Sequence, residues 1–517
     1  MGLRRSIALL LISAAIAFAQ VSRSYAIASD YVRQNRLDIA IPMLEKILSD
    51  TPNDLMCRNL LGIALLNSGR KEEAVEQFRK ALQADPDFRA ALKNLAVAEM
   101  ALGSRNDAKA HFERLLKLTP ADPVAHLYMG EINFAENHPQ QAIDHYNQSG
   151  DLHWKDPQVT IHFAKSALQL NQPKLAEDAL EHLGLDVPNF RFEAGVMLAA
   201  AKRYSAAAMH FAAAQNGYPD PYEVGFNLTL MHVEAQNYPA AIFSGEKLAE
   251  KYRKAELYNL LSRAYEGGGT TQQAYDALRT ATQIDPNDET NYLDLMSLCL
   301  AHENWDLSLE ISDIALTHAP NSYRVHLERG AVLAMKGRTE DAEKEFVAAT
   351  RLDPKTSLPL VALAIIQIEL KKPEEAAVAL RARRKQNPKD YLVDWFLAEA
   401  LVQVGADPGT PNEKEAVAAL EDAVSANSTA VSPRVLLGKL LAKRGNTARA
   451  TAQFEAALKL DPGNVTAAYQ LATLYRKAGN TRRATELMTL VGKATSASDA
   501  SLSPRRELVR IVREGAK

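Results

Sequence analysis

Histidine is the residue type whose distribution in this 517-residue chain could indicate a chemical site. Nine of the twelve histidines lie between His111 and His232, and neighbouring imidazoles can bind a metal ion or titrate near neutral pH. His111, His145 and His210 occupy the same position in different copies of a helical repeat. Equivalent side chains of adjacent repeats lie about 10 Å apart, which is too far for one metal ion. We therefore expect histidines on solvated helix faces and no metal site.

Sequence motifs that carry catalysis are missing. The chain contains no H-E-x-x-H, no G-x-x-x-x-G-K-[ST], no G-x-S-x-G and no C-x-x-C. The glycines at 267–269 lack a preceding strand, so they indicate a turn and not a phosphate loop. Cys57 and Cys299 are seven repeats apart, which favours two small core residues over a disulfide. We expect no enzymatic activity and no cofactor.

The charge balance is close to neutral. The sequence has 60 Lys and Arg against 63 Asp and Glu, a formal net charge of −3. A nucleic-acid-binding protein would show a strongly basic face. The composition therefore predicts no nucleic-acid partner.

Alanine and proline recur every 34 residues through most of the chain. This period defines the helices that must position any site. A period of this length, built from two helices, is typical of a repeat solenoid. Small residues let the two helices approach closely, and proline ends the second helix. The recurring residues include Ala40, Ala74, Ala108, Ala142 and Ala176, and Pro286, Pro320, Pro354 and Pro388.

The repeat itself has a recognisable pattern. In the unit at residues 55–88, positions 7, 8, 20, 24 and 32 hold Leu61, Gly62, Ala74, Phe78 and Pro86. This pattern closely resembles the tetratricopeptide repeat family. The resemblance covers nearly all of the chain after the N-terminus. It implies an all-α, right-handed superhelical solenoid of about fourteen helix-turn-helix repeats, which we place at residues 20–492.

Some repeats depart from the pattern. The fifth to seventh units are the most degenerate, and Gly245 stands where the seventh would carry a bulky residue at position 24. Residues 406–412 are an insertion rich in turn residues between the two helices of the twelfth unit. We expect this insertion to form a surface loop.

The N-terminus indicates export. Arg4 and Arg5 precede an apolar run at residues 7–18, and Ala17 and Ala19 suit a signal peptidase. We expect a signal peptide at residues 1–19 and a periplasmic or secreted protein, with no transmembrane span after cleavage. Cleavage after Ala26 is chemically feasible but would remove part of the first repeat helix. The alternative is an uncleaved membrane anchor.

The C-terminus carries a short basic helix. Residues 493–501 are small and polar, which predicts a flexible joint, and Ser503 and Pro504 resemble a helix start. We expect residues 493–517 to form this joint and a helix that caps the last repeat, because an open solenoid end needs a cover. The alternative is a basic tail that binds an anionic partner.

Function in tetratricopeptide proteins usually resides on the concave groove, where positions 2, 5, 9 and 12 of each first helix point inward. These positions combine aromatic and polar residues, which suits an extended peptide bound over several repeats. The partner-binding candidates are Tyr25, Asn59, Lys93, Phe134, Phe192, Phe226, Asn259, Arg263, Trp395 and Tyr469.

Two specialised functions of the family fit the sequence poorly. Carboxylate-binding adaptors need an Asn one turn after Lys93, where this chain has Val97. Sugar-transferring relatives carry a catalytic domain, which is missing here. The sequence thus predicts an exported scaffold that binds proteins or extended peptides and supports cell-envelope assembly or secretion. The alternative is an accessory protein that handles an exported polysaccharide.

Overall fold

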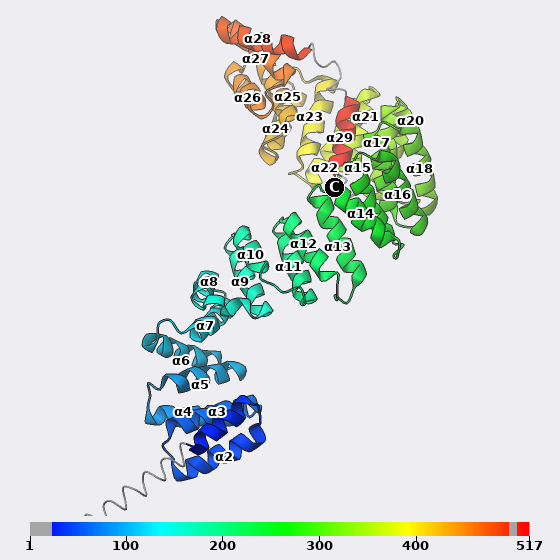
Figure 1. Ribbon diagram of the computed structural model, residues 1–517. Coiled ribbons are helices and arrows are strands. Elements are labelled where there is room, and N and C mark those ends of the chain that lie inside the picture. The colour runs from blue at the N-terminus through cyan, green and yellow to red at the C-terminus, as the bar shows by residue number, and fades with distance from the viewer. Residues whose placement is uncertain (1–22, 496–503, 516–517) are drawn as a thin grey trace, which may run out of the picture. The chain divides into compact units, whose positions relative to one another are not determined.

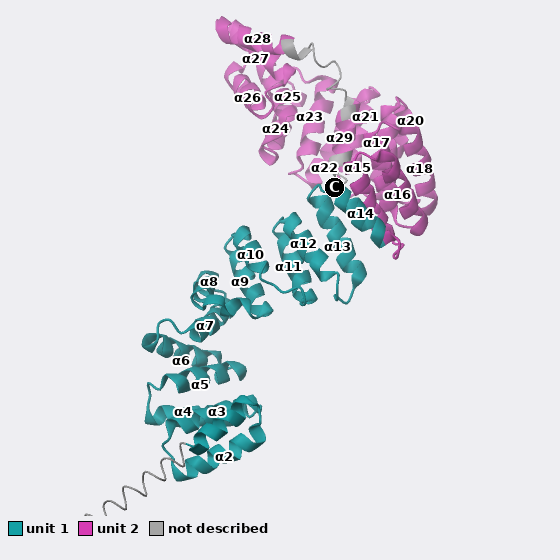
Figure 2. Ribbon diagram, viewed as in Figure 1, with its two compact units in different colours: residues 1–248 teal, residues 249–517 magenta. Residues whose placement is uncertain are grey.

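The computed structural model describes residues 23–495 and 504–515 (Figure 1). The expected signal peptide and most of the expected joint lie outside these residues. Over the described ranges the chain is α-helical, with one 3₁₀ segment and no strand. Contacts divide it into two compact units, residues 1–248 and 249–517 (Figure 2).

The first unit begins with a helix at residues 23–33. This helix pairs with α2, and the helices α3 to α14 form six further pairs, which gives seven pairs in the unit. They are α2 (Leu37–Asp50), α3 (Leu55–Asn67), α4 (Lys71–Ala84), α5 (Arg89–Ala101), α6 (Arg105–Leu118), α7 (Pro123–Ala135), α8 (Pro139–Gln148), the 3₁₀ segment η1 (Gly150–Trp154), α9 (Pro157–Gln169), α10 (Pro173–Leu180), α11 (Pro188–Ala200), α12 (Tyr204–Ala214), α13 (Pro221–Glu234) and α14 (Tyr238–Ala249).

The second unit contains seven further pairs and one additional helix. They are α15 (Ala255–Gly267), α16 (Thr271–Ile284), α17 (Glu289–Ala301), α18 (Trp305–His318), α19 (Tyr323–Met335), α20 (Thr339–Leu352), α21 (Leu358–Glu369), α22 (Pro373–Gln386), α23 (Tyr391–Gly405), α24 (Pro411–Ala426), α25 (Val431–Lys443), α26 (Thr447–Leu460), α27 (Val465–Lys477), α28 (Thr481–Thr495) and α29 (Pro504–Gly515). Seven pairs in each unit give fourteen, so the all-α repeat solenoid predicted from the sequence is confirmed.

In repeats with glycine at position 8 of the first helix, the aromatic ring at position 24 of the second helix fills the space beside that glycine. Phe454 at position 24 is fully buried, and a Cβ added at Gly438 would lie 2.6 Å from its Cε1. The same arrangement pairs Gly330 with Phe346. Glycine at position 8 therefore lets the first helix lie directly on the aromatic ring of the second, as the spacing predicts.

In the seventh repeat the large and small residues at positions 8 and 24 are exchanged. Position 8 is Thr229, which is fully buried, and position 24 is Gly245, which is buried as well. The Thr229 hydroxyl donates to the carbonyl of Gly225 at 2.9 Å. The larger side chain now lies on the first helix, and the Thr229 hydroxyl contacts the Ser244 hydroxyl of α14 at 2.9 Å.

First helices of neighbouring repeats lie closer together than second helices do. In each unit, first helices contact one another, as α3 does with α5 and α19 with α21. Second helices of neighbouring repeats show no comparable contact in the described chain. Since the closer helices of a curved stack lie on its inner side, the first helices form what we call the inner face.

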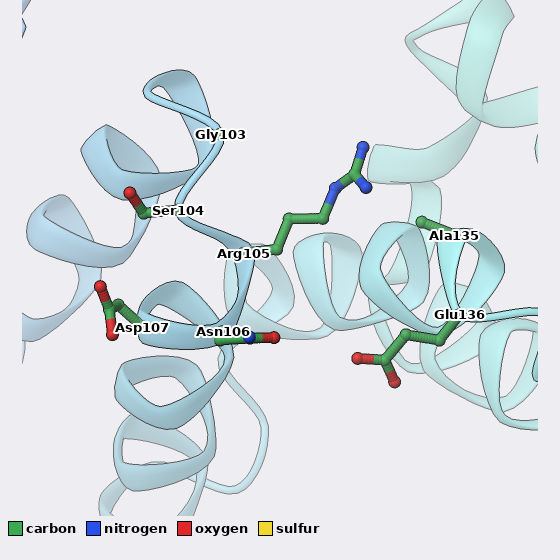
Figure 3. Close-up of a pocket in the computed structure, with 7 residues that line it drawn as sticks. All are labelled: Gly103, Ser104, Arg105, Asn106, Asp107, Ala135 and Glu136. Carbon is green, nitrogen blue, oxygen red and sulfur yellow. The ribbon is translucent and has the colours of Figure 1, made fainter.

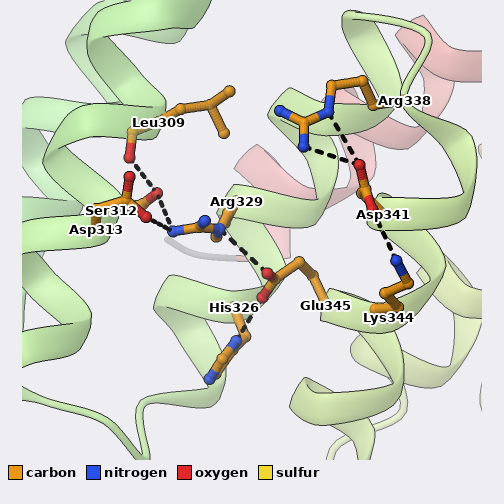
Figure 4. Close-up of polar contacts among 9 residues, drawn as sticks. All are labelled: Leu309, Ser312, Asp313, His326, Arg329, Arg338, Asp341, Lys344 and Glu345. Atoms are coloured by element: carbon orange, nitrogen blue, oxygen red, sulfur yellow. Dashed lines mark hydrogen bonds and ion pairs between the residues drawn. The ribbon is translucent and has the colours of Figure 1, made fainter.

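Polar side chains also link neighbouring repeats (Figure 4). Arg329 of α19 pairs with Asp313 of α18, and its Nε lies 3.1 Å from Oε1 of Glu345 on α20. Nδ1 of His326 lies 2.6 Å from the other carboxylate oxygen of Glu345. Three helices of two repeats thus share one charged cluster, which fixes the register between the repeats.

The insertion in the twelfth repeat is a surface loop, as expected, although it is shorter than the sequence suggests. Helix α23 ends at Gly405, and α24 already begins at Pro411. Asp407 is exposed and pairs with Lys443 at 2.8 Å. Ala406 alone turns into the core, with 4% exposure.

The C-terminal helix does not cap the last repeat. Within the described residues, α29 contacts α19 and α21, which belong to repeats four and three positions before the last repeat, α27 and α28. Figure 1 shows α29 beside α21. Helix α28 exposes threonine, arginine and glutamate side chains together with Met488. The apolar residues of α29 instead cover part of the inner face, where apolar side chains would otherwise meet water.

We predict that Gly438→Ala lowers the free energy of unfolding of the second unit by about 1–3 kcal/mol, because the new methyl group overlaps the Phe454 ring. Denaturant unfolding followed by circular dichroism measures this. Adding Phe454→Leu should recover part of the loss. Gly492→Ala in α28 is the matched control: its Cβ would meet nothing within 4 Å, so alanine should be neutral or stabilising. Equal effects of both substitutions would contradict the packing argument.

Candidate functional site

The sequence suggested that the position-23 histidines lie on solvated helix faces, but His111 and His145 are half-buried and His210 is buried. Nδ1 of His111 lies 2.8 Å from Glu99, and Nδ1 of His145 lies 2.9 Å from Nδ1 of His126. His210 is only 4% exposed, and burial, together with nearby Arg191, lowers its pKa to about 4. Position 23 faces the interface between repeat helices, so each of these side chains has a partner inside the array. No group of three metal-binding side chains occurs among the described residues.

Both cysteines are buried thiols. The Cys57 thiol donates to the carbonyl of Leu44 at 3.6 Å. Burial raises the pKa of Cys57 to about 12 and that of Cys299 to about 11. Because the thiolate is the reactive form, neither side chain is set up for nucleophilic or redox chemistry.

The polar groove candidates of the first unit bond to neighbouring repeats. Asn59 is buried and accepts a hydrogen bond from Asn94 at 2.8 Å. Lys93 pairs with Asp122 at 3.1 Å. Tyr25 is half-buried against the first core cluster. These contacts connect successive first helices, so the side chains contribute to the array itself.

The aromatic candidates of the first unit likewise stack on protein rings. Phe134 stacks on His162 with a centroid separation of 4.1 Å, and Phe192 stacks on Tyr218 at 4.2 Å. Phe226 is half-buried, with its ring tilted against that of Tyr222 at 5.9 Å. Each of these three rings packs against a ring of its own or the next repeat, and the three rings are not stacked on one another.

The four candidates of the second unit occupy different environments. Asn259 donates to Asn291 at 2.8 Å, and Arg263 is exposed. Burial raises the pKa of the nearby Asp294, while Arg324 and Arg263 act in the opposite direction. Tyr469 is 49% exposed, whereas Trp395 is only 5% exposed. Asn259 and Arg263 share α15, Trp395 lies on α23 and Tyr469 on α27, and of the four only Trp395 borders a large cleft.

A hollow on the first unit is polar and lies at repeat turns (Figure 3). It encloses about 510 Å³ between the start of α6 and the end of α7, and its lining includes Arg105, Asp107 and Glu136. Glu136 is already paired with Lys109 at 2.7 Å. This hollow offers no apolar anchor for a partner, so it is not our candidate site.

The candidate site is an apolar stretch of the inner face of the second unit, which the sequence reasoning missed. Helix α21 is apolar on all sides, and its residues 359–367 are all buried. A repeat helix normally keeps one side toward the open groove, so a helix that is apolar all round must be covered by something else. That composition was the signal available in the sequence.

Helix α29 covers part of this stretch. Leu508, Ile511 and Val512 are 0–3% exposed and belong to the same core cluster as the inner-face residues of α19 and α21. Arg505 pairs through its guanidinium with Glu369 at the end of α21, the Nε lying 2.9 Å from Oε1. An amphipathic helix is thus held by one apolar side and one ion pair.

A cleft of about 740 Å³ continues beside α29 toward the next repeats. Its lining combines apolar and charged side chains. The lining comprises Ile365, Ile368, Glu369, Lys371, Trp395, Phe396, Glu399, Val402, Gln403, Ser432, Val435, Leu436, Lys439, Asn464, Thr466 and Glu507.

The centre of the cleft contains an acidic group in an apolar setting. Burial raises the pKa of Glu399, while Trp395 and Lys439 act in the opposite direction. The buried indole of Trp395 exerts its effect on Glu399 through a side-chain hydrogen bond. Trp395 packs on Phe396, with ring centroids 4.4 Å apart. The cleft therefore offers apolar and aromatic side chains and the carboxyl group of Glu399 to a bound chain.

No described helix is both long enough and apolar enough to cross a membrane.

Comparisons with known proteins identify the repeats. Three family models described as Tetratricopeptide repeat match the sequence: the first at residues 25–87 and 412–464, the second at 72–132 and 441–500, and the third at 255–288. A search of curated protein sequences found no match.

Several solved helical structures are similar over long stretches. The yeast Tom70 structure has 15% identity and a TM-score of 0.38, with 89% of this chain and 95% of that chain covered. The Cut9–Hcn1 hetero-tetramer of the APC/C has 13% identity and a TM-score of 0.39, with 95% of each chain covered. MamA has 17% identity and a TM-score of 0.29, with 32% of this chain and 94% of that chain covered. At these TM-scores the matches carry no argument about function. The chain is an all-α solenoid that contains tetratricopeptide repeats in both of its units.

Proposed function

We propose that this protein is a scaffold that binds a protein partner on the inner face of its second unit. The observation that carries the proposal is the apolar stretch on α21 and α23, which α29 covers in part and the cleft leaves open in part. Apolar clefts with a few polar groups at fixed positions are the usual form of a binding site. The partner segment we expect is a peptide or helix with large apolar side chains.

The alternative that the partner is a polysaccharide receives no support from the described side chains. A sugar chain would need exposed rings on consecutive repeats. Phe134 and Phe192 instead stack on neighbouring protein rings, and Trp395 is almost fully buried. A protein segment that fills the cleft matches these surfaces better.

Export is part of the proposal. It rests on the residues before the first repeat: Arg4 and Arg5, the apolar run and the small residues at Ala17 and Ala19. An exported repeat scaffold without catalytic motifs would serve as an assembly or secretion factor of the cell envelope. Its partner would then be another envelope or secreted protein.

We predict that the mature chain begins at Gln20 and is found in the periplasm or outside the cell. N-terminal mass spectrometry of protein purified from its native source checks this. Replacement of Ala17 and Ala19 by Asp should block cleavage and leave the longer chain. A native protein that keeps Met1 and stays in the membrane fraction would contradict soluble export.

The role of the cleft in partner binding is tested by a substitution that fills it with a large side chain. Lys439 is exposed at its edge, so we predict that Lys439→Trp reduces partner capture at least tenfold while the unfolding midpoint stays unchanged. Crosslinking pull-down from the envelope fraction, quantified by mass spectrometry, measures capture. Lys459→Trp, an exposed lysine on the second helix α26, is the matched control and should capture partners normally. Equal capture by both variants would rule out this cleft.

Trp395 calls for a different measurement because it is part of the core. We predict that Trp395→Ala lowers the free energy of unfolding by about 3–5 kcal/mol, because a buried ring is removed. Denaturant unfolding of the full chain checks this. A change below 1 kcal/mol would show that the indole contributes little to packing and is available to a ligand.

A further inference from the structure

We propose that the surface of α19 and α21 beneath α29 is a binding surface for an amphipathic helix of a partner protein, and that α29 is its resident substitute. The inference rests on the proposed function, because it takes the inner face to be where partners bind. It adds the kind of partner and the element that occupies its place in the free protein.

The surface beneath α29 is made for an apolar occupant. On α19 the inner-face positions hold Leu327, Ala331 and Ala334, all 0–3% exposed. On α21 they hold Val361 and Ile365, which are 0% and 5% exposed. Small residues on α19 beside larger ones on α21 leave room for a helix to lie close against the array. Without an occupant these side chains would face water.

The occupant shows which chemistry this surface selects. Leu508, Ile511 and Val512 have the spacing i, i+3, i+4 and therefore share one side of a helix. Arg505 lies three residues before Leu508 and pairs with Glu369. Arg510 lies on the exposed side and bonds to Glu507 within α29 itself. A partner helix with apolar residues at this spacing and a cation one turn earlier would make the same contacts.

Helix α29 is an addition to the array and not one of its parts. Each of the other helices of this unit from α15 to α28 packs against its partner in a repeat, whereas α29 has no such partner. Its described contacts are with α19 and α21. Helices α19 and α21 keep their contacts with α20 and α22 when α29 is absent. Helix α29 can therefore dissociate from the array without disrupting a repeat.

The cleft gives a partner an advantage over α29. It begins beside Glu507 and continues over Trp395 and Glu399 to Val435. A partner segment longer than α29 would fill this space as well as the surface that α29 covers. A basic side chain on that extension would meet the carboxyl of Glu399. The intramolecular helix, in turn, benefits from a high effective concentration, so only a segment with these additional contacts displaces it.

The test uses a synthetic peptide of residues 503–517 as the probe and the full-length chain as the receptor. In the wild-type chain the resident helix competes with the peptide. In the variant Leu508→Glu/Ile511→Glu, two carboxylates on the apolar side release α29 from the array. We expect the labelled peptide to bind the released variant at least tenfold more tightly than the wild type, as measured by fluorescence anisotropy. Arg510→Gln, on the exposed side of α29, is the matched control and should bind the peptide as the wild type does.

A charge exchange keeps the test decisive if the double variant folds poorly. The single variant Arg505→Glu leaves all apolar side chains intact and should raise peptide affinity a few-fold. A peptide with the same Arg505→Glu change should bind the wild-type chain weakly. Glu369→Arg in a chain that keeps its own Arg505 should restore the binding of this peptide. Equal peptide affinity for the wild-type, released and Arg505→Glu chains overturns the proposal. Circular dichroism of each variant excludes global unfolding.

The two proposals fail in different ways. In one outcome, the peptide binds the released variant more tightly than the wild type, but both chains capture envelope partners equally. Helix α29 then occupies the surface, and the proposed function of that surface is wrong. If capture depends on the cleft variant Lys439→Trp but the peptide binds all α29 variants alike, the proposed function holds and the role of α29 is overturned.

Discussion

Close packing of the two helices in five of the repeats depends on a side chain that is absent. Where position 8 is glycine, the ring at position 24 lies against the bare backbone of the first helix, and no Cβ would fit between them. This contact sets the distance between the two helices and therefore the direction in which the next repeat stacks. The seventh repeat, with Thr229 opposite Gly245, shows that the constraint is on the combined volume of the two positions and not on the residue at either one.

A stack built this way has two kinds of surface. Faces between repeats are closed by the neighbour, but the inner face stays open unless another segment lies on it. Elsewhere the inner positions mix polar and apolar residues, and the rings of Phe134 and Phe192 stack on His162 and Tyr218. Helix α21 is different because all its sides are apolar. The position of α29 and the cleft beside Trp395 both follow from that single departure.

The fold could be predicted from the sequence because the period, the small residues and the rings act within one repeat. The candidate site could not. The position rule correctly placed Trp395 on the inner face but gave equal weight to Asn59 and Lys93, whose partners come from neighbouring repeats and are invisible to a rule applied to one repeat. The cap assigned to the last repeat failed for a related reason: the destination of α29 is set by the exposed surface of a distant helix.

The ion pair between Arg505 and Glu369 joins residues 136 positions apart, whereas the repeats are built from contacts between helices adjacent in sequence. Local contacts form early in folding, and contacts of long sequence separation form late. During synthesis, α21 is complete well before the ribosome reaches α29. Every newly made chain therefore passes through a period in which the apolar stretch of the second unit is folded but uncovered. In that interval the stretch is open to any helix that arrives first, including one from a neighbouring copy of the same chain.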